Sequence, residues 1–147
     1  MGDVRSAGKH TRRTALMLAG AAMPLRPQAE GKAVPHPIAH FEIGCRDRAK
    51  TAEFYSTLFD WKIQEQGPAS NIDTGVAGAI AGHITSLGHE PQHYTTFYVQ
   101  VEDIRASLKK AESLGGKTLV PPITLPGAGT FAWMSDPDGN TVGLLQK

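Results

Sequence analysis

The residues of this chain that could do acid–base or hydrogen-bonding chemistry lie on two short stretches of alternating polarity. In the first, from Ile38 to Gly44, His40 and Glu42 alternate with apolar residues, so a strand would carry both on one face. An imidazole and a carboxylate placed together can serve as a general base, and His40 and Glu42 are therefore the candidate catalytic residues. In the second stretch, from Tyr94 to Val101, the corresponding face carries three hydrogen-bonding residues: Thr96, Tyr98 and Gln100.

Each of these strands leads into a helix. Asp47 is suited to cap a helix that runs to Phe59, and Asp103 is suited to cap a second helix that ends at Gly115-Gly116. Short strands are predicted after each helix, at 61–63, 71–74 and 78–85, and then at 117–120, 130–135 and 141–146, with breaks at Pro121-Pro122 and Pro126-Gly127. The two caps lie 56 residues apart, which indicates two copies of one βαβββ unit, over about residues 38–85 and 94–147. The predicted fold class is α+β.

Three phrases occur in the order found in one known family. They are AEFYSTLFDWKI after the first helix cap, LGGKTLVPP after the second helix, and the closing SDPDGNTVGLLQ, whose DPDG is a tight-turn signal. Over about residues 38–147 the chain resembles the vicinal oxygen chelate superfamily, which includes glyoxalase I, bleomycin-resistance proteins and extradiol dioxygenases. It is most similar to glyoxalase-like bacterial proteins of unassigned function. The resemblance implies one curved mixed-sheet cup that holds a small organic ligand, and it implies a homodimer.

The resemblance also implies a metal site with up to four ligands, one from the first and one from the last strand of each unit. The first-strand positions lie seven residues before the helix caps, at His40 and Thr96. Aligning the two units puts Gly82 and Gly143 at the last-strand positions. His40 is then the only metal ligand left, so the site is expected to be incomplete and no cofactor is expected, with a divalent metal as the alternative.

Three further histidines could in principle act as ligands of this metal site. His83 neighbours Gly82 and should point to the opposite face of its strand, so that only a β-bulge would bring it into the site. His89 and His93 lie in the polar connection between the units, where solvated side chains are expected. His40 itself has an alternative role as a pocket histidine that hydrogen-bonds to its neighbours.

The expected ligand pocket is lined by polar side chains, with two glycines that leave room on its wall: His40, Glu42, Thr96, Tyr98, Gln100, Gly82 and Gly143. The alternative is that large residues such as Trp133 and Met134 fill the space. The pocket favours a metal-independent protein that binds a small organic molecule, partly aromatic or carbonyl-bearing. The alternative function is a lyase, isomerase or dioxygenase of the same superfamily, dependent on a metal or using His40 or Glu42 as general base.

Residues 1–37 look unlike a folded domain. A basic opening, nine apolar residues from Ala15 to Met23 and a proline-rich stretch describe an export signal, and nine residues are too few to span a bilayer. The run from Thr11 to Leu16 resembles a twin-arginine signal, with Ala15 where phenylalanine is usual. The sequence thus predicts a periplasmic protein, and the alternative is a cytoplasmic protein with a disordered basic tail.

Composition narrows the classes of partner. A chain of 147 residues with 40% hydrophobic content suits one domain with a core. Six of the 15 Lys and Arg lie in residues 1–33, which leaves nine basic against twelve acidic residues in the remainder. A mildly acidic body without a basic cluster argues against nucleic-acid binding. The single cysteine, Cys45, rules out an intrachain disulfide and is expected to be a small buried residue.

Overall fold

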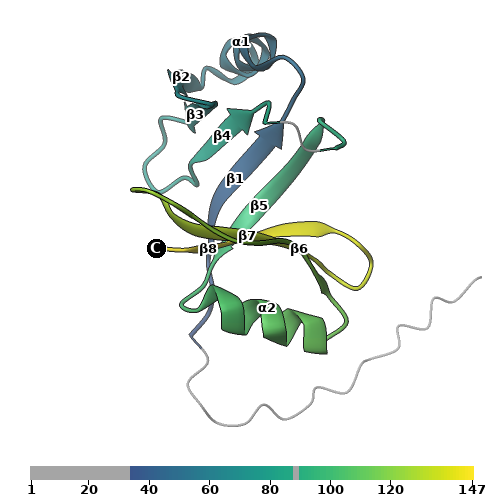
Figure 1. The fold of residues 1–147 in the computed structure, drawn as a ribbon. Helices are drawn as coiled ribbons and strands as arrows, with labels where there is room; N and C mark the ends of the chain where they lie inside the picture. Colours follow the sequence, from purple (N-terminus) through teal and green to yellow (C-terminus); the bar gives the residue numbers. More distant parts are fainter. Residues whose placement is uncertain (1–33, 88–89) are drawn as a thin grey trace, which may run out of the picture. The chain divides into compact units, whose positions relative to one another are not determined.

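The computed structural model describes residues 34–87 and 90–147, so the expectations about the N-terminal segment up to residue 33 and about His89 lie outside the described residues. Within this part, a strand, a helix and three strands follow one another twice (Figure 1). The first unit consists of β1 (Ile38–Gly44), α1 (Arg48–Phe59), β2 (Lys62–Gln66), β3 (Ala69–Asp73) and β4 (Gly82–Thr85). The second consists of β5 (Tyr94–Gln100), α2 (Ile104–Ser113), β6 (Lys117–Leu125), β7 (Gly129–Ser135) and β8 (Thr141–Gln146). The predicted α+β fold with two βαβββ units is confirmed.

All eight strands belong to one mixed sheet, in the order β2-β3-β4-β1-β5-β8-β7-β6. In each unit the first and last strands pair in parallel, β1 with β4 and β5 with β8. The two units join where β1 and β5 run antiparallel, side by side in the middle of the sheet (Figure 1). This central junction brings the two stretches of alternating polarity into register, with His40 opposite Tyr98 and Glu42 opposite Thr96.

Both predicted helix caps are present. The Asp47 carboxylate accepts a hydrogen bond from the Lys50 amide at 3.0 Å, and the Asp103 carboxylate accepts one from the Ala106 amide at 2.9 Å. Each bond satisfies one of the backbone N–H groups that the first turn of a helix leaves without an intrahelical acceptor. The caps therefore fix where the two helices begin.

The helices pack unequally against the sheet. From α2, Ile104 and Leu108 are buried in a cluster that includes Leu144 of β8. None of the twelve residues of α1 is buried, although Ala52 and Tyr55 pack against a second cluster formed by Ile43, Cys45, Ile72 and Ile84. At the end of α1, Leu58 and Phe59 are 56% and 50% exposed.

β6 is longer than the sequence indicated. A break was predicted at Pro121-Pro122, but β6 continues through both prolines to Leu125. The reason is its place at the edge of the sheet, where a missing backbone N–H on the open side costs no ladder hydrogen bond. The pairing of β6 with β7 shifts register between Val120 and Ile123, so the prolines sit at a bulge.

The two faces of the sheet differ in chemistry. Phe41 and Ile43 belong to the cluster that α1 covers, so the alternate residues of β1, His40 and Glu42, lie on the other face. We call the face that carries His40 and Glu42 the polar face. Within the described residues, no helix has the length and apolar character needed to cross a membrane.

Candidate functional site

A buried carboxylate lies at the centre of the polar face. Glu42 is 4% exposed and accepts hydrogen bonds from two phenols, Tyr94 at Oε1 and Tyr98 at Oε2. The Tyr98 hydroxyl in turn accepts a hydrogen bond from Trp133 Nε1 at 2.7 Å. Burial of a carboxylate is tolerable only where such donors replace water, and charge-assisted bonds of this kind are stronger than neutral ones. Glu42, Tyr94, Tyr98 and Trp133 therefore form one connected polar network.

Two histidines extend this network toward solvent. His40 Nε2 and His83 Nδ1 lie 2.7 Å apart, within hydrogen-bond distance, and the two rings stack with centroids 5.0 Å apart. On the other side of its ring, His83 Nε2 lies 3.5 Å from Glu42 Oε2. The His83 side chain is 22% exposed, whereas the Glu42 side chain is 5% exposed. The network thus runs from a buried carboxylate to a pair of half-buried imidazoles.

Burial determines the charge of the pair. Burial, together with the neighbouring His83, lowers the pKa of His40 to about 4, although Glu42 acts in the opposite direction. Burial also lowers the pKa of His83, again against the opposing effect of Glu42. Both imidazoles are therefore neutral near pH 7. Burial and the Glu42 carboxylate raise the pKa values of Tyr94 and Tyr98, which keeps both phenols protonated as donors.

Two glycines make room for the tyrosine rings. A Cβ added at Gly143 would lie 2.3 Å from the ring of Tyr98, and one added at Gly44 would lie 2.1 Å from the ring of Tyr94. Any side chain at either position would displace a ring that hydrogen-bonds Glu42. The space that Gly143 leaves on the polar face is therefore occupied by Tyr98.

The structure places most of the sequence-predicted pocket residues on the polar face. His40, Glu42 and Tyr98 are brought together in the network. Thr96 is buried, and its hydroxyl donates a hydrogen bond to the Thr141 carbonyl at 3.0 Å. This hydroxyl is therefore engaged with the backbone and not with the histidine pair. Gln100 lies at the end of β5, where it is half-buried and its backbone N–H donates to the Pro37 carbonyl.

The predicted orientations of Gly82 and His83 are wrong. In the parallel pairing of β1 with β4, Phe41 stands opposite Gly82 and Glu42 opposite His83. Gly82 therefore faces the helix side, where an added Cβ would lie 2.4 Å from the Phe41 ring, and it does not line the polar face. His83 reaches the site without a bulge.

The error came from the alignment of the two units. Glu42 and Tyr98 both lie five residues before a helix cap, and their partners on the last strands are His83 and Gly143. His83, and not Gly82, is thus the counterpart of Gly143. The residue-by-residue pairing of β4 with β1 places His83 opposite Glu42 and so identifies it as a residue of the site.

Tyr94 and Trp133 were not predicted as members of a hydrogen-bonding site. Tyr94 could have been found from alternation, because it lies two residues before Thr96 on the same face of β5. Trp133 was named only in the alternative in which it and Met134 fill the space of the pocket. Trp133 does lie buried on the polar face, but Met134 packs against the α2 cluster on the other face.

The side chains present do not fit the four-ligand metal site of the family. His40 and His83 stand at two of its positions, whereas the Thr96 hydroxyl is engaged with a backbone carbonyl and Gly143 has no side chain. The nearby Glu42 carboxylate already accepts from two phenols. In residues 34–87 and 90–147, no group of three or more His, Cys, Asp and Glu side chains is arranged to hold a metal ion.

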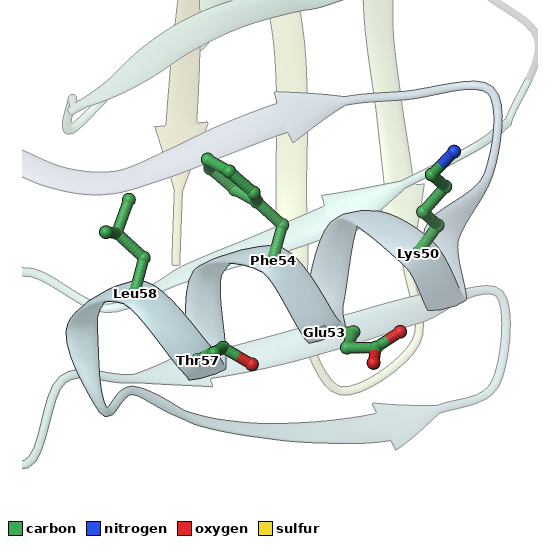
Figure 2. Close-up of a pocket in the computed structure, with 5 residues that line it drawn as sticks. All are labelled: Lys50, Glu53, Phe54, Thr57 and Leu58. Atoms are coloured by element: carbon green, nitrogen blue, oxygen red, sulfur yellow. The ribbon is translucent and has the colours of Figure 1, made fainter.

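Two surface hollows lie elsewhere. One is lined by Lys50, Glu53, Phe54, Thr57 and Leu58, all from α1. Figure 2 shows Lys50, Phe54 and Leu58 on one side of this helix and Glu53 and Thr57 on another. The second hollow lies at the start of α2 and is lined mainly by polar residues, among them Asp103, Arg105 and Gln146. Neither hollow includes a residue of the network.

Comparison with known proteins gives the family. Residues 37–144 match the model of the Glyoxalase/Bleomycin resistance protein/Dioxygenase superfamily, and the chain belongs to this superfamily. A glyoxylase-like domain-containing protein of Didymella fabae is 34% identical over 119 residues, which cover 75% of this chain and 93% of that protein. The anthracycline biosynthesis protein DnrV of Streptomyces peucetius is 29% identical over 131 residues, but the match spans only 48% of its length.

Solved structures agree on the fold. A hypothetical protein of Bacillus halodurans superposes with a TM-score of 0.60 at 12% identity, over 76% of this chain and 94% of that one. A superfamily member from Vibrio splendidus superposes with a TM-score of 0.53 at 14% identity, over 77% of this chain and the whole of that one. At such low identity the superpositions establish the fold alone.

Proposed function

We propose that this chain binds a small organic molecule on the polar face of its sheet, beside the His40–His83 pair, and that it does so without the four-ligand metal site. The superfamily is one whose members bind small molecules. The observation that carries the proposal is the half-buried histidine pair at the solvent end of a network whose central carboxylate is buried. A ligand would contact this end, because the rings of Tyr94, Tyr98 and Trp133 fill the deeper part of the face.

Binding is favoured over catalysis by the basicity of the pair. A general base works best when its pKa lies near the operating pH. The pKa of His40 is about 4, so its imidazole holds a proton too weakly to be an efficient base near neutrality. The second candidate function is that of a lyase, isomerase or dioxygenase in which His40 or Glu42 acts as base. It is supported by the contacts that link the Glu42 carboxylate to the two imidazoles.

The relatives suggest the first ligand to try. One similar protein acts in anthracycline biosynthesis, and anthracyclines are polycyclic, aromatic and fluorescent. Titrating an anthracycline with the full chain should quench its fluorescence with a saturable curve. The His40→Ala variant should bind at least ten-fold more weakly, since it removes a half-buried imidazole at the solvent end of the network. The His93→Ala variant, at an exposed histidine, should bind like wild type. Equal affinity of the His40→Ala variant would sink the proposed site.

The metal-dependent alternative has a separate test. Elemental analysis of protein purified without chelators should find well under one divalent ion per chain, in wild type and in His40→Ala alike. About one equivalent in wild type that disappears in His40→Ala would instead establish the metalloenzyme version.

We also propose that the protein is exported. The support is the twin-arginine pattern at Arg12-Arg13 and the short apolar run behind it. In a bacterial host, the chain should be recovered in the periplasmic fraction, and a variant with Lys at both positions should stay in the cytoplasm. An unchanged distribution would argue for a basic tail.

Assembly as a homodimer is a further proposal. It is supported by the habit of the superfamily and by the apolar surface of α1, where Phe54 and Leu58 are 58% and 56% exposed. Light scattering coupled to gel filtration should give twice the mass of the chain. The Phe54→Glu variant should give the monomer mass, whereas a monomeric wild type would refute the proposal.

A further inference from the structure

The hydrogen bonds of the network all run in one direction. Glu42 is an acceptor, and Tyr94 and Tyr98 both donate to it. Trp133 Nε1, which can only donate, gives its hydrogen to the Tyr98 hydroxyl. The carboxylate thus orients every partner whose hydrogen position can be deduced.

The same carboxylate selects the tautomer of His83. Its Nε2 lies 3.5 Å from Glu42 Oε2, and a nitrogen lone pair facing a carboxylate oxygen would be repelled. The hydrogen of neutral His83 therefore belongs on Nε2, which leaves Nδ1 as an acceptor. His83 Nδ1 lies 2.7 Å from His40 Nε2, so the hydrogen between them must come from His40.

His40 then has its lone pair on Nδ1. Its Nε2 carries the hydrogen that His83 accepts, and a neutral imidazole has only one N–H. Among the residues that the structure describes, none donates a hydrogen bond to His40 Nδ1. The network therefore ends toward solvent in a hydrogen-bond acceptor.

We infer that the site recognises its ligand through a neutral hydroxyl group, that of a phenol or an enol, which donates a hydrogen bond to His40 Nδ1. The inference rests on the proposed function and names the chemical class of its ligand. An aromatic hydroxyl suits the surroundings, because the ring of Tyr98 lies 6.0 Å from that of His40, between centroids.

The charges around His40 explain why the ligand stays neutral. The groups around it are Glu42 on β1, His83 on β4 and Tyr98 on β5, and the charge of Lys147 after β8 has a smaller electrostatic effect on it. Glu42 is negative and buried, so a phenolate or carboxylate placed beside the pair would be repelled and would also lose its hydration.

A pair of small probes tests the inference in the full chain. 4-Nitrophenol absorbs visible light only as its anion and loses its proton near neutral pH, whereas 4-nitroanisole has the same ring without a hydroxyl donor. At the pH of half-ionisation, adding protein should bleach the visible absorbance, because the neutral form is bound. The affinity for 4-nitrophenol should fall about ten-fold per pH unit above that point and should exceed the affinity for 4-nitroanisole at least ten-fold.

Variants and spectra complete the test. His40→Phe, which keeps an aromatic ring, should abolish the preference for 4-nitrophenol, while His93→Ala should keep it. In the free protein, ¹⁵N spectra of the imidazoles should show the hydrogen on Nε2 in both His40 and His83. A gain of visible absorbance, equal binding of the two probes, no binding of either, or the opposite tautomers would each overturn the inference. Anthracycline binding that depends on His40 alongside equal probe affinities would leave the proposed function standing.

Discussion

The Gly143→Ala substitution tests the packing on which the site depends. The new Cβ would lie 2.3, 2.5 and 2.7 Å from three ring carbons of Tyr98. Carbon atoms in contact are normally about 3.5–4.0 Å apart, so the ring or the strand must move by roughly 1 Å. Neither moves freely, because Tyr98 is 6% exposed and is held by Glu42 and Trp133.

The expected loss of stability follows from three terms. Overpacking of a buried site costs about 1–3 kcal/mol, and weakening a hydrogen bond to a charged group costs about 1.5–3 kcal/mol when the ring shifts. Replacing glycine stabilises the folded state by about 0.4–1 kcal/mol through the unfolded chain. Together these terms predict a net destabilisation of about 1.5–5.5 kcal/mol. The free energy of unfolding typically falls by about 1–3 kcal/mol per molar urea, so the urea midpoint should fall by about 0.5 M or more.

Urea unfolding, followed by tryptophan fluorescence and by circular dichroism, measures this loss. The control is the same substitution in a Tyr98→Leu background, where no ring meets the new methyl group and the penalty should fall below about 1 kcal/mol. A Gly143→Ala variant within about 0.5 kcal/mol of wild type, or an equal penalty in both backgrounds, would refute the close-packed tyrosine.

Two further predictions concern pH and helix capping. Because the folded state lowers the pKa of His40 from 6.5 to about 4, the unfolded chain binds more protons in this window, so stability should fall as the pH falls from 6.5 to 4. The stability of the His40→Gln variant should fall less steeply with pH over the same window. Urea midpoints of both proteins, measured at several pH values, test this, and an equal dependence on pH in wild type and variant would contradict the reasoning. Asp103→Ala removes the cap of α2 and should cost about 1 kcal/mol, whereas Asp103→Asn, which keeps an acceptor, should cost a few tenths. Equal urea midpoints for these two variants would contradict the role of the cap.

The repeated unit could be predicted because its signals are local. Asp47 and Asp103 mark the helix starts by short side-chain hydrogen bonds, and period-two alternation marks β1 and β5. The second unit's closing strand, β8, also begins and ends where the sequence indicated. The bounds of β2 and β3 also differ from the predicted ranges, 61–63 and 71–74. The strand ends that differ most, the start of β4 and the end of β6, lie where glycines or prolines make the local pattern ambiguous.

Residues of the site could be predicted where the alternation of side chains along a single strand was enough to assign them to one face of the sheet. His40, Glu42, Thr96 and Tyr98 lie on the polar face as β1 and β5 indicated. His83 could not be assigned in this way, since its facing depends on how β4 aligns with β1, some 40 residues away in the chain. A shift of one residue in such a pairing turns every side chain of a strand to the other face.

The sequence by itself determined the two βαβββ units, the helix caps and which residues of β1 and β5 share a face, because these follow from periodicity and from contacts a few residues long. Only the tertiary structure decided that Gly82 turns away, that His83 joins His40 and Glu42, and that Tyr98 occupies the space left by Gly143. These outcomes depend on strand register and on the volume of neighbouring rings, which a local pattern does not contain. The chemistry of the site, a buried carboxylate linked to two neutral imidazoles, is therefore a product of the folded sheet.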